Sequence, residues 1–255
     1  LTDDEKLKWN EVYGPINKEF EKNKPLGKAL TLWKYQRYLE DYLGSIKSVD
    51  DNIGRVLEYL DNNGLYDNTL VIYTSDQGFY LGEHGWFDKR FMYEESFRTP
   101  LLIRYPPVIE KGSIDSNLVQ NIDLAPTILD FAGLEIPIDM QGLSLMPLLE
   151  NKEVDWRNEL YYHYYEYPGI HMVKRHYGIR TERYKLIHFY YDIDEWELYD
   201  LQKDPQELNN VYNTKQYIEV RELLHERLAL LRQKYKDSKE LDDMFIENDL
   251  ERRNN

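Results

Sequence analysis

The chain contains 255 residues, of which 47 are acidic and 32 are basic, and its formal net charge is -15. This charge argues against nucleic acid and against an anionic membrane surface as partners, because both repel an acidic protein. The chain contains no cysteine. That excludes disulfide bonds, thiolate zinc sites and cysteine nucleophiles, so any metal needs oxygen or imidazole ligands.

The first part of the chain is predicted to alternate helices with strands. Residues 1–24 combine charge and proline without a clear period, and we expect them to form a surface arm or loop that leads into the next element. Residues 30–60 repeat apolar side chains at helical spacing, which predicts one or two amphipathic helices. After Asn63-Gly64, residues 69–74 are apolar and β-branched without alternation, which is typical of a strand buried on both faces. This order predicts a parallel sheet in an α/β fold.

A polar, glycine-rich segment, residues 75–89, follows this strand at the position where open α/β sheets bind ligands. Residues 101–105 are predicted to form another strand, and residues 122–131 a short helix. Residues 142–149 close this unit, so we expect a first domain over residues 1–150.

A second, smaller domain is expected over residues 151–255, where the sequence becomes rich in tyrosine. Partly alternating segments predict the antiparallel strands of a small sheet, at residues 160–167, 177–180, 184–190 and 196–199. An amphipathic helix is predicted over residues 220–235. The charged end beyond Asp237 is expected to be frayed.

The segment after the first strand carries the groups with the clearest chemistry. Asp76 and Gln77 place a carboxylate oxygen beside an amide oxygen, and calcium and magnesium prefer such ligands. Gly78 permits close backbone approach, and Lys89 adds a cation. A metal and a lysine around one point can hold a tetrahedral oxyanion, which favours a sulfate or phosphate ester as substrate. On composition alone, an ordinary turn explains the acid-amide-glycine triplet equally well.

Five separated groups of residues, in a constant order, carry a resemblance to a known family. They are Val49-Asp50-Asp51-Asn52-Ile53-Gly54; Thr74-Ser75-Asp76-Gln77-Gly78 with Leu81-Gly82-Glu83-His84-Gly85 and Lys89; Glu94-Glu95-Ser96 with Arg98 and residues 100–106; Asp123-Leu124-Ala125-Pro126-Thr127 through Gly133; and Gly142-Leu143-Ser144 with Pro147-Leu148-Leu149. Over residues 34–208 the chain resembles the second half of the calcium-dependent, formylglycine-using sulfatases. It is most similar to bacterial sulfatases of the mucin-desulfating or N-acetylglucosamine-6-sulfatase type.

The resemblance implies an α/β, alkaline-phosphatase-like fold: a mixed sheet flanked by helices, followed by a small antiparallel sheet plus a helix. It implies that Asp76 and Gln77 ligate Ca²⁺, with Gln77 replacing the family's more frequent asparagine. It also implies that Lys89 is a catalytic residue that contacts the sulfate and the leaving oxygen. The family's formylglycine motif, two acidic ligands and a histidine acid have no match here and would precede Leu1. We therefore expect a fragment that is inactive alone and needs the N-terminal half of the same protein as partner.

The substrate that the resemblance implies is a sulfated carbohydrate of the glycosaminoglycan or mucin type, and the implied location is periplasmic or secreted. Two alternatives stay open. One is a phosphatase or phosphonate hydrolase of the alkaline phosphatase superfamily. The other is a noncatalytic glycan-binding module, which the missing nucleophile and the tyrosine-rich sheet favour.

Further residues are candidates by position and charge. We expect His84 to act in catalysis and Glu83 to bind substrate, with fixation of the loop as the alternative role. His171, Arg175 and His176 are expected to bind substrate as an accessible cationic cluster, or to form an exposed counter-charge patch.

Other polar residues are expected to be structural. Glu94, Glu95 and Arg98 are spaced for ion pairs along one helical turn. Residues 192–195 are read as a hairpin turn rather than a calcium loop, because they lack the required glycine. Three histidines, His163, His188 and His225, are also interpreted as structural.

Overall fold

The computed structural model describes residues 1–254. They divide into two compact units, Leu1–Tyr66 and Asp67–Asn255, which are described separately below. The domain boundary expected at residue 150 lies inside the second unit and stays a prediction. Among the described residues, no helix combines the length and the apolar character that crossing a membrane requires.

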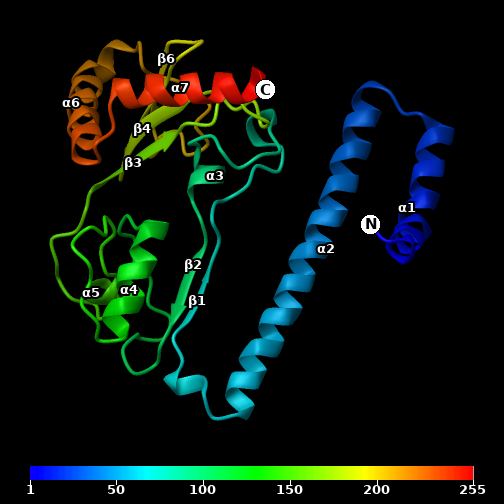
Figure 1. Cartoon of the computed structure of the whole chain (residues 1–255), viewed down its shortest axis with the longest axis horizontal. Helices are drawn as coiled ribbons and strands as arrows, with labels where there is room; N and C mark the ends of the chain where they lie inside the picture. The colour runs from blue at the N-terminus through cyan, green and yellow to red at the C-terminus, as the bar shows by residue number, and fades with distance from the viewer. Residues whose placement is uncertain (255) are drawn as a thin grey trace. The chain divides into compact units, whose positions relative to one another are not determined.

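Two helices, α1 (Asp3–Asn23) and α2 (Gly27–Asn62), form the first unit (Figure 1). Residues 1–24 lie at the surface as expected, but the expectation of an irregular arm or loop is wrong, since α1 is a regular helix. A capping box starts it: the Thr2 side chain accepts from the Glu5 N–H, and the Glu5 carboxylate accepts from the Thr2 N–H at 2.7 Å. The helix predicted over residues 30–60 is confirmed as one helix of 36 residues. Neither helix, within the residues described, contains a buried side chain.

The second unit begins with the 3₁₀ turn η1 (Tyr66–Asn68) and two strands, β1 (Val71–Thr74) and β2 (Leu101–Arg104). The two predicted strands are confirmed, but their pairing is antiparallel, with Val71 opposite Arg104. The strand is not buried on both faces either, since the Tyr73 side chain is 40% exposed. The apolar run correctly indicated a strand, but it could not reveal the direction of the strand's partner.

Short helices precede and follow β2: η2 (Glu83–Gly85), α3 (Glu94–Phe97), η3 (Asn121–Asp123), α4 (Leu124–Phe131) and α5 (Met146–Leu149). The helix predicted over residues 122–131 is thereby confirmed. Asp123 at its start is fully buried and forms an ion pair with Arg157. The same carboxylate accepts the N–H groups of Gln120 and Leu143 at 2.7 and 2.8 Å. Because its hydrogen-bonding capacity is satisfied, this buried charge can hold three separate segments together.

A four-stranded antiparallel sheet follows, as the tyrosine-rich sequence predicts. Its strands lie in the order β3 (Glu159–Tyr164), β4 (His176–Thr181), β5 (Tyr184–Phe189) and β6 (Glu195–Asp200). The β4–β5 turn holds Thr181 opposite Tyr184, whose N–H donates to the Thr181 hydroxyl at 2.9 Å. Each strand contacts its neighbour in the sequence.

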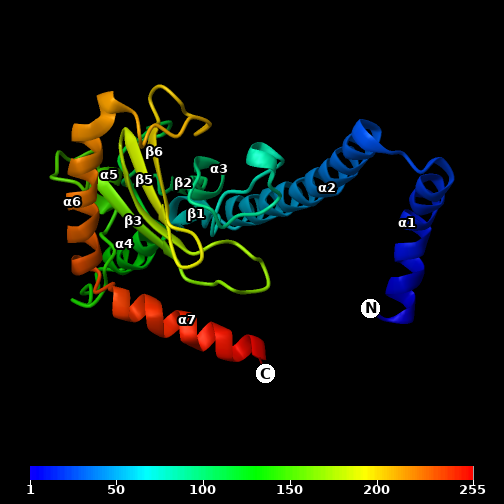
Figure 2. The same cartoon turned by 90° about the horizontal axis from the view of Figure 1, so that it is seen from above.

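The two faces of this sheet have different covers (Figures 1 and 2). On one face, Ile179, Leu186 and Leu198 pack against Leu224 and Leu228 of helix α6 (Ile218–Lys234), which follows the turn η4 (Lys215–Tyr217). On the other face, adjacent residues such as Ile187 and Tyr199 pack with Tyr80 and Met92. Successive residues of a strand point to opposite faces. The sheet therefore anchors α6 on one side and the chain that follows β1 on the other.

The last helix, α7 (Lys239–Asn254), corrects the expectation of a frayed end beyond Asp237. Its Asp242 pairs with Arg232 of α6 at 2.8 Å, and its Asp249 pairs with Arg175 at 2.7 Å. The Phe245 ring lies 4.9 Å from the Tyr165 ring. These tertiary contacts, which local sequence does not reveal, hold α7 against the sheet.

Candidate active site

Asp76 and Lys89 meet beyond the carboxyl end of β1. Their side chains form an ion pair between the Lys89 Nζ and the Asp76 Oδ2. The hydrogen bond from Lys89 holds the pKa of the Asp76 carboxyl below its usual range. The Asp76 side chain is 69% exposed and that of Lys89 is 35% exposed. Residues 75–90, called the strand-end segment below, thus bring a carboxylate and an ammonium to one accessible point, as the sequence predicts.

Gln77 lies beside this pair and is half-buried. Its side-chain amide contacts the hydroxyl of Tyr162 on β3, and burial raises the pKa of that hydroxyl to about 12. The same hydroxyl donates to the Arg90 carbonyl at 2.8 Å. Tyr162 therefore connects both ends of the strand-end segment to the sheet.

Gly78 allows the strand-end segment to lie directly against α3. A Cβ atom at this position would be 2.0 Å from the Glu95 carbonyl oxygen and 2.9 Å from that of Arg98. The Gly78 N–H donates to the Ser96 carbonyl at 2.7 Å, and the Ser96 hydroxyl donates to the Lys89 carbonyl at 2.6 Å. Glycine is needed here because backbone, rather than a flexible side chain, fills the adjacent space.

Tyr80 anchors the centre of the strand-end segment. Its side chain is completely buried against the small sheet, and its hydroxyl donates to the Phe91 carbonyl at 3.1 Å. Its N–H donates to the Asp88 carbonyl at 2.9 Å, which closes the loop in front of Lys89. Asn121 fixes the other end, since its side-chain amide donates to the Asp76 carbonyl at 2.8 Å.

His84 and Glu83 lie in the turn η2. The His84 ring stacks on Tyr93, with 4.6 Å between ring centroids, and its Nε2 lies 3.4 Å from the Glu95 Oε2. Its side chain is 12% exposed. Glu83 is exposed, and its carboxylate accepts the Leu81 N–H at 2.6 Å. These contacts are those of residues that fix a loop; the catalytic and substrate-binding roles expected for them stay predictions.

The cationic cluster expected at His171, Arg175 and His176 is not accessible as a whole. Arg175 is fully buried, and its guanidinium donates to the Tyr167 carbonyl and to the Asp249 carboxylate. His176 is also fully buried, and burial lowers its pKa to about 4, so it is neutral near pH 7. The expectation of exposed cations is corrected for these two residues, because both lie inside the packing of the sheet.

His171 is exposed and lies next to the strand-end segment. Its Nε2 is 2.8 Å from an Nη2 of Arg90, whose other terminal nitrogen pairs with Asp88 at 2.7 Å. Of the three residues expected to form the cationic cluster, His171 is thus the one that contacts the strand-end segment. Its substrate-binding role stays a prediction.

The fit of calcium to the predicted ligands can be judged from their chemistry. Asp76 provides an accessible carboxylate and Gln77 an amide oxygen, both of which are ligand types that Ca²⁺ prefers. Calcium takes about six to eight oxygen ligands. Asp76 and Gln77 therefore fit part of a calcium site, and further oxygen ligands are required to complete one.

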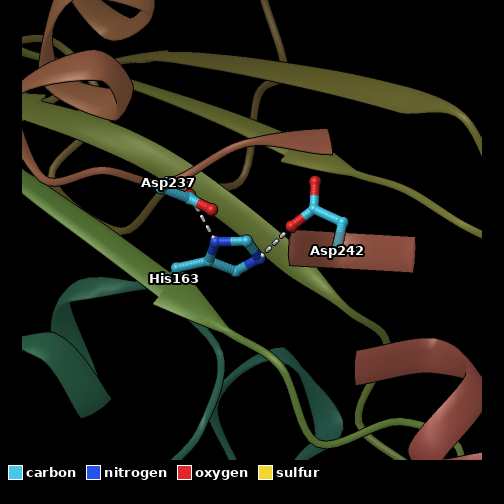
Figure 3. A group of neighbouring side chains, drawn as sticks. All are labelled: His163, Asp237 and Asp242. Carbon is cyan, nitrogen blue, oxygen red and sulfur yellow. Dashed lines mark hydrogen bonds and ion pairs between the residues drawn. The ribbon is translucent and has the colours of Figure 1, made fainter. Parts of the chain in front are cut away.

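A second group with metal-ligand chemistry lies elsewhere and includes His163, for which the sequence predicts a structural role. His163, Asp237 and Asp242 each offer a ligand atom, and these atoms lie within 4.8 Å of one another (Figure 3). The imidazole contacts Asp237 through Nδ1 at 2.7 Å and Asp242 through Nε2 at 3.6 Å. Arg232 pairs with both carboxylates, so their charge is already compensated. This arrangement suits a hydrogen-bonded connection between β3 and α7 better than an all-oxygen calcium site.

Sequence reasoning missed a buried charge network next to α3. Lys185 is fully buried and pairs with Glu94 at 2.8 Å and Glu207 at 2.7 Å. Arg180 approaches the same Glu94 carboxylate at 3.3 Å. Burial opposes ionisation of Glu94, but Lys185 and Arg180 outweigh it and lower the Glu94 pKa. The pairing expected between Glu94 and Arg98 is therefore wrong, because cations from the sheet occupy the carboxylate.

Comparison with known proteins identifies the family of this chain. A family model described as "N-sulphoglucosamine sulphohydrolase, C-terminal" matches residues 82–234, and one described as "Sulfatase" matches residues 8–134. The chain belongs to the sulfatase family. It is 56% identical over 234 residues to an N-acetylglucosamine-6-O-sulfatase of Bacteroides thetaiotaomicron, a match that covers 91% of this chain and 42% of that sulfatase.

Solved structures give the same result. The chain matches the structure of BT4656 in complex with its substrate D-glucosamine-2-N,6-O-disulfate, with a TM-score of 0.88, 54% identity, and coverage of 94% of this chain and 49% of that one. It also matches a phosphonate monoester hydrolase of Agrobacterium radiobacter, with a TM-score of 0.68, 33% identity, and coverage of 76% and 40%. The predicted alkaline-phosphatase-like sulfatase fold is thereby confirmed. The chain spans less than half the length of each of these proteins.

Proposed function

We propose that the whole protein hydrolyses sulfate esters on carbohydrate, with a glucosamine-type sugar sulfated at its 6-oxygen as the substrate class. The observation that carries this proposal is the 56% identity to an N-acetylglucosamine-6-O-sulfatase over 91% of the chain. The similar structure in complex with D-glucosamine-2-N,6-O-disulfate supports the choice of sugar. A periplasmic or secreted location is part of the proposal and is supported by the family resemblance alone.

In this proposal, Lys89 is the catalytic residue that the described chain supplies. Its ammonium lies on the Asp76 carboxylate at an accessible point, so an anionic ester held there would be within its reach. A cation placed where negative charge develops lowers the barrier to departure of the alcohol oxygen. Ser96 and Asp88 fix the Lys89 backbone from two sides, which limits the positions that the ammonium can take.

Asp76 and Gln77 are proposed to ligate calcium together with oxygen ligands from the N-terminal half of the protein. When bound, calcium would orient the ester and compensate its charge. The family resemblance also implies a formylglycine nucleophile, and the printed sequence contains no match to that motif. His84 and Glu83 are proposed to fix the loop between Gln77 and Lys89, while catalysis by His84 and substrate binding by Glu83 stay predictions.

The test compares the turnover rates of several substrates by the whole protein. We expect faster turnover of an aryl sulfate than of the matching aryl phosphate, and faster turnover of N-acetylglucosamine 6-sulfate than of its 3-sulfate isomer. Preference for the phosphate contradicts the sulfatase assignment. Equal rates for both sulfated sugars contradict the proposed position of the ester only.

A phosphonate or phosphate hydrolase is the second candidate function. The match to a phosphonate monoester hydrolase favours it, because that structure shares 33% identity over 76% of this chain. A metal and a lysine stabilise a phosphoryl oxyanion by the same electrostatics as a sulfuryl oxyanion. Including an aryl phosphonate in the substrate series decides between the two.

A further inference from the structure

An open pocket of about 560 Å³ lies beside α3, at the end of the small sheet where the β4–β5 turn and the chain after β6 meet. Three arginines line it: Arg98 follows α3, Arg180 is the last but one residue of β4, and Arg183 precedes β5. A pocket of this volume accommodates a small ligand. Three guanidinium groups around one hollow are unusual in a chain whose net charge is -15.

The arginines retain hydrogen-bond donors for a ligand. Arg180 uses Nε and Nη2 on Glu94, at 3.4 and 3.3 Å, and Arg183 uses Nε and Nη2 on Asp200, at 3.0 and 2.8 Å. Within the described part of the chain, the Nη1 group of each has no partner. Arg98 is exposed, and its guanidinium makes no hydrogen bond or ion pair with any described residue.

The remaining lining groups complement a sugar rather than a bare anion. Glu182 and Gln202 are exposed and can accept hydrogen bonds from hydroxyl groups, while Leu201 and Pro205 provide apolar surface. Glu94 also lines the pocket, where its half-buried carboxylate is compensated by Arg180 and by Lys185, which pairs with the buried Glu207 as well. The negative charge of Glu94 is therefore compensated, and the unpaired guanidinium donors stay available to a ligand.

We infer that this pocket binds an acidic pyranose, whose carboxylate or sulfate group is held by Arg98 together with the free Nη1 groups of Arg180 and Arg183. Arginine suits this role because its planar fork matches the oxygens of both anions. The choice of a sugar over other organic anions rests on the proposed function. The pocket is distinct from the Asp76–Lys89 pair, although Gly78 packs against the Arg98 carbonyl and joins the two regions.

Binding to the whole protein tests this inference by isothermal titration calorimetry and by NMR of the arginine Nε–H groups. The probes are methyl glucuronide for the carboxylate, glucosamine N-sulfate for the sulfate, and methyl N-acetylglucosaminide as the neutral sugar. We expect at least one acidic probe to bind about tenfold more tightly than the neutral one, as charge-assisted hydrogen bonds allow. The carboxylate and sulfate arms show which anion the pocket prefers.

Two substitutions of one arginine make the test specific. Arg98→Ala should weaken binding of the acidic probe about tenfold, and Arg98→Lys should restore part of it, because lysine keeps the charge and loses the fork. Folding should be unaffected, since the side chain has no partner to lose. The matched control is Arg55→Ala, which removes a charge from α2, where Arg55 contacts Asn52 at 2.8 Å. Glu182→Gln should leave binding intact or tighten it, because it removes a like charge and keeps an acceptor.

The results separate this inference from the proposed function. Absence of binding, equal binding of neutral and acidic sugars, or an unchanged affinity in Arg98→Ala each overturns the inference. Lys89→Ala should leave the binding of the acidic probes unchanged if the pocket is the site. Loss of binding in that variant would instead assign the probes to the strand-end segment. Phosphate preference in the whole protein would contradict the sulfatase proposal and leave the pocket result standing.

Discussion

Five of the six residues of β4 are buried, whereas in residues 75–90 Tyr80 alone is buried. The small sheet places apolar and aromatic side chains on both faces, and burial of such groups stabilises the fold. The strand-end segment keeps its carboxylate, amide and ammonium groups accessible and depends on the sheet for its position, through Tyr80 and Tyr162. The small sheet thus provides stability and the strand-end segment provides the reactive groups, and two tyrosines connect these two regions.

The largest expected effect lies in the sheet and concerns His176. Burial lowers its pKa from 6.5 to about 4, so the unfolded chain binds a proton between these pH values that the folded chain does not bind. The contribution of His176 to the free energy of unfolding should therefore be fully present above pH 6.5. It should be lost as the pH drops through this window, by about 3 kcal/mol. The measurement is the free energy of unfolding by urea at each end of the window.

His176→Phe should remove this part of the pH dependence, because phenylalanine can keep the stacking on Phe91 and carries no titratable nitrogen. His163, His188 and His225 also have lowered pKa values, so the comparison is between slopes of the variant and the unchanged chain. The exposed His171→Phe serves as the control. Identical slopes for His176→Phe and the unchanged chain would contradict the prediction.

The next effect should appear in the strand-end segment as a loss of rate. Lys89→Ala in the whole protein should lower kcat about 100-fold, as removal of one oxyanion-stabilising group does, which corresponds to about 2.7 kcal/mol. The matched control is Lys174→Ala, since Lys174 is 34% exposed and pairs with Asp192 much as Lys89, 35% exposed, pairs with Asp76. An unchanged kcat for Lys89→Ala would remove this residue from the mechanism.

Gly78 tests the connection between the segment and α3. Gly78→Ala places a Cβ atom 2.0 Å from the Glu95 carbonyl oxygen, so the backbone must move, at a cost of about 2 kcal/mol. Gly54→Ala in α2 is the control, because nothing lies within 4 Å of its added Cβ. That change should stabilise the helix by up to about 1 kcal/mol. Thermal unfolding of both variants checks the prediction, and two shifts of the same sign would contradict it.

The smallest expected effect concerns the metal. At a free calcium concentration about ten times the dissociation constant, binding should stabilise the whole protein by about 1.4 kcal/mol. Asp76→Ala should abolish this stabilisation, whereas the exposed Asp67→Ala should leave it in place. The difference in melting temperature with calcium and with a chelator measures it. If the calcium shift persists in Asp76→Ala, the metal lies elsewhere.

Local patterns predicted much of the fold correctly. The strands of the small sheet and the helices near residues 30–60, 122–131 and 220–235 follow from the periodic spacing of their apolar residues, although the helix over residues 30–60, as the structure describes it, contains no buried side chain. The helix α1 was missed although Thr2 and Glu5 form a capping box, since Pro15 and the irregular apolar spacing suggested a loop. The antiparallel pairing of β1 depends on how a distant segment returns, which a single strand does not encode.

In the site, too, contacts within one segment could be predicted from the sequence, whereas contacts between distant segments could not. The meeting of Asp76 with Lys89 was predictable because both residues lie in one short segment behind a strand. The burial of Arg175 and His176 was not, since it depends on Asp249 and Phe91, which come from other parts of the chain. The Lys185 network and the arginine-lined pocket likewise combine residues that are far apart in sequence.

The contact between Gly78 and α3 also limits how this region can change in length. Gly78 is bound to Ser96, and Lys89 is bound to the same residue from the other side. An insertion between Lys89 and Ser96 would shift the ammonium away from Asp76, whereas residues 85–87 are exposed at the tip of the loop. We expect related chains to vary in length at that tip and to keep the spacing from residue 89 to residue 98 constant.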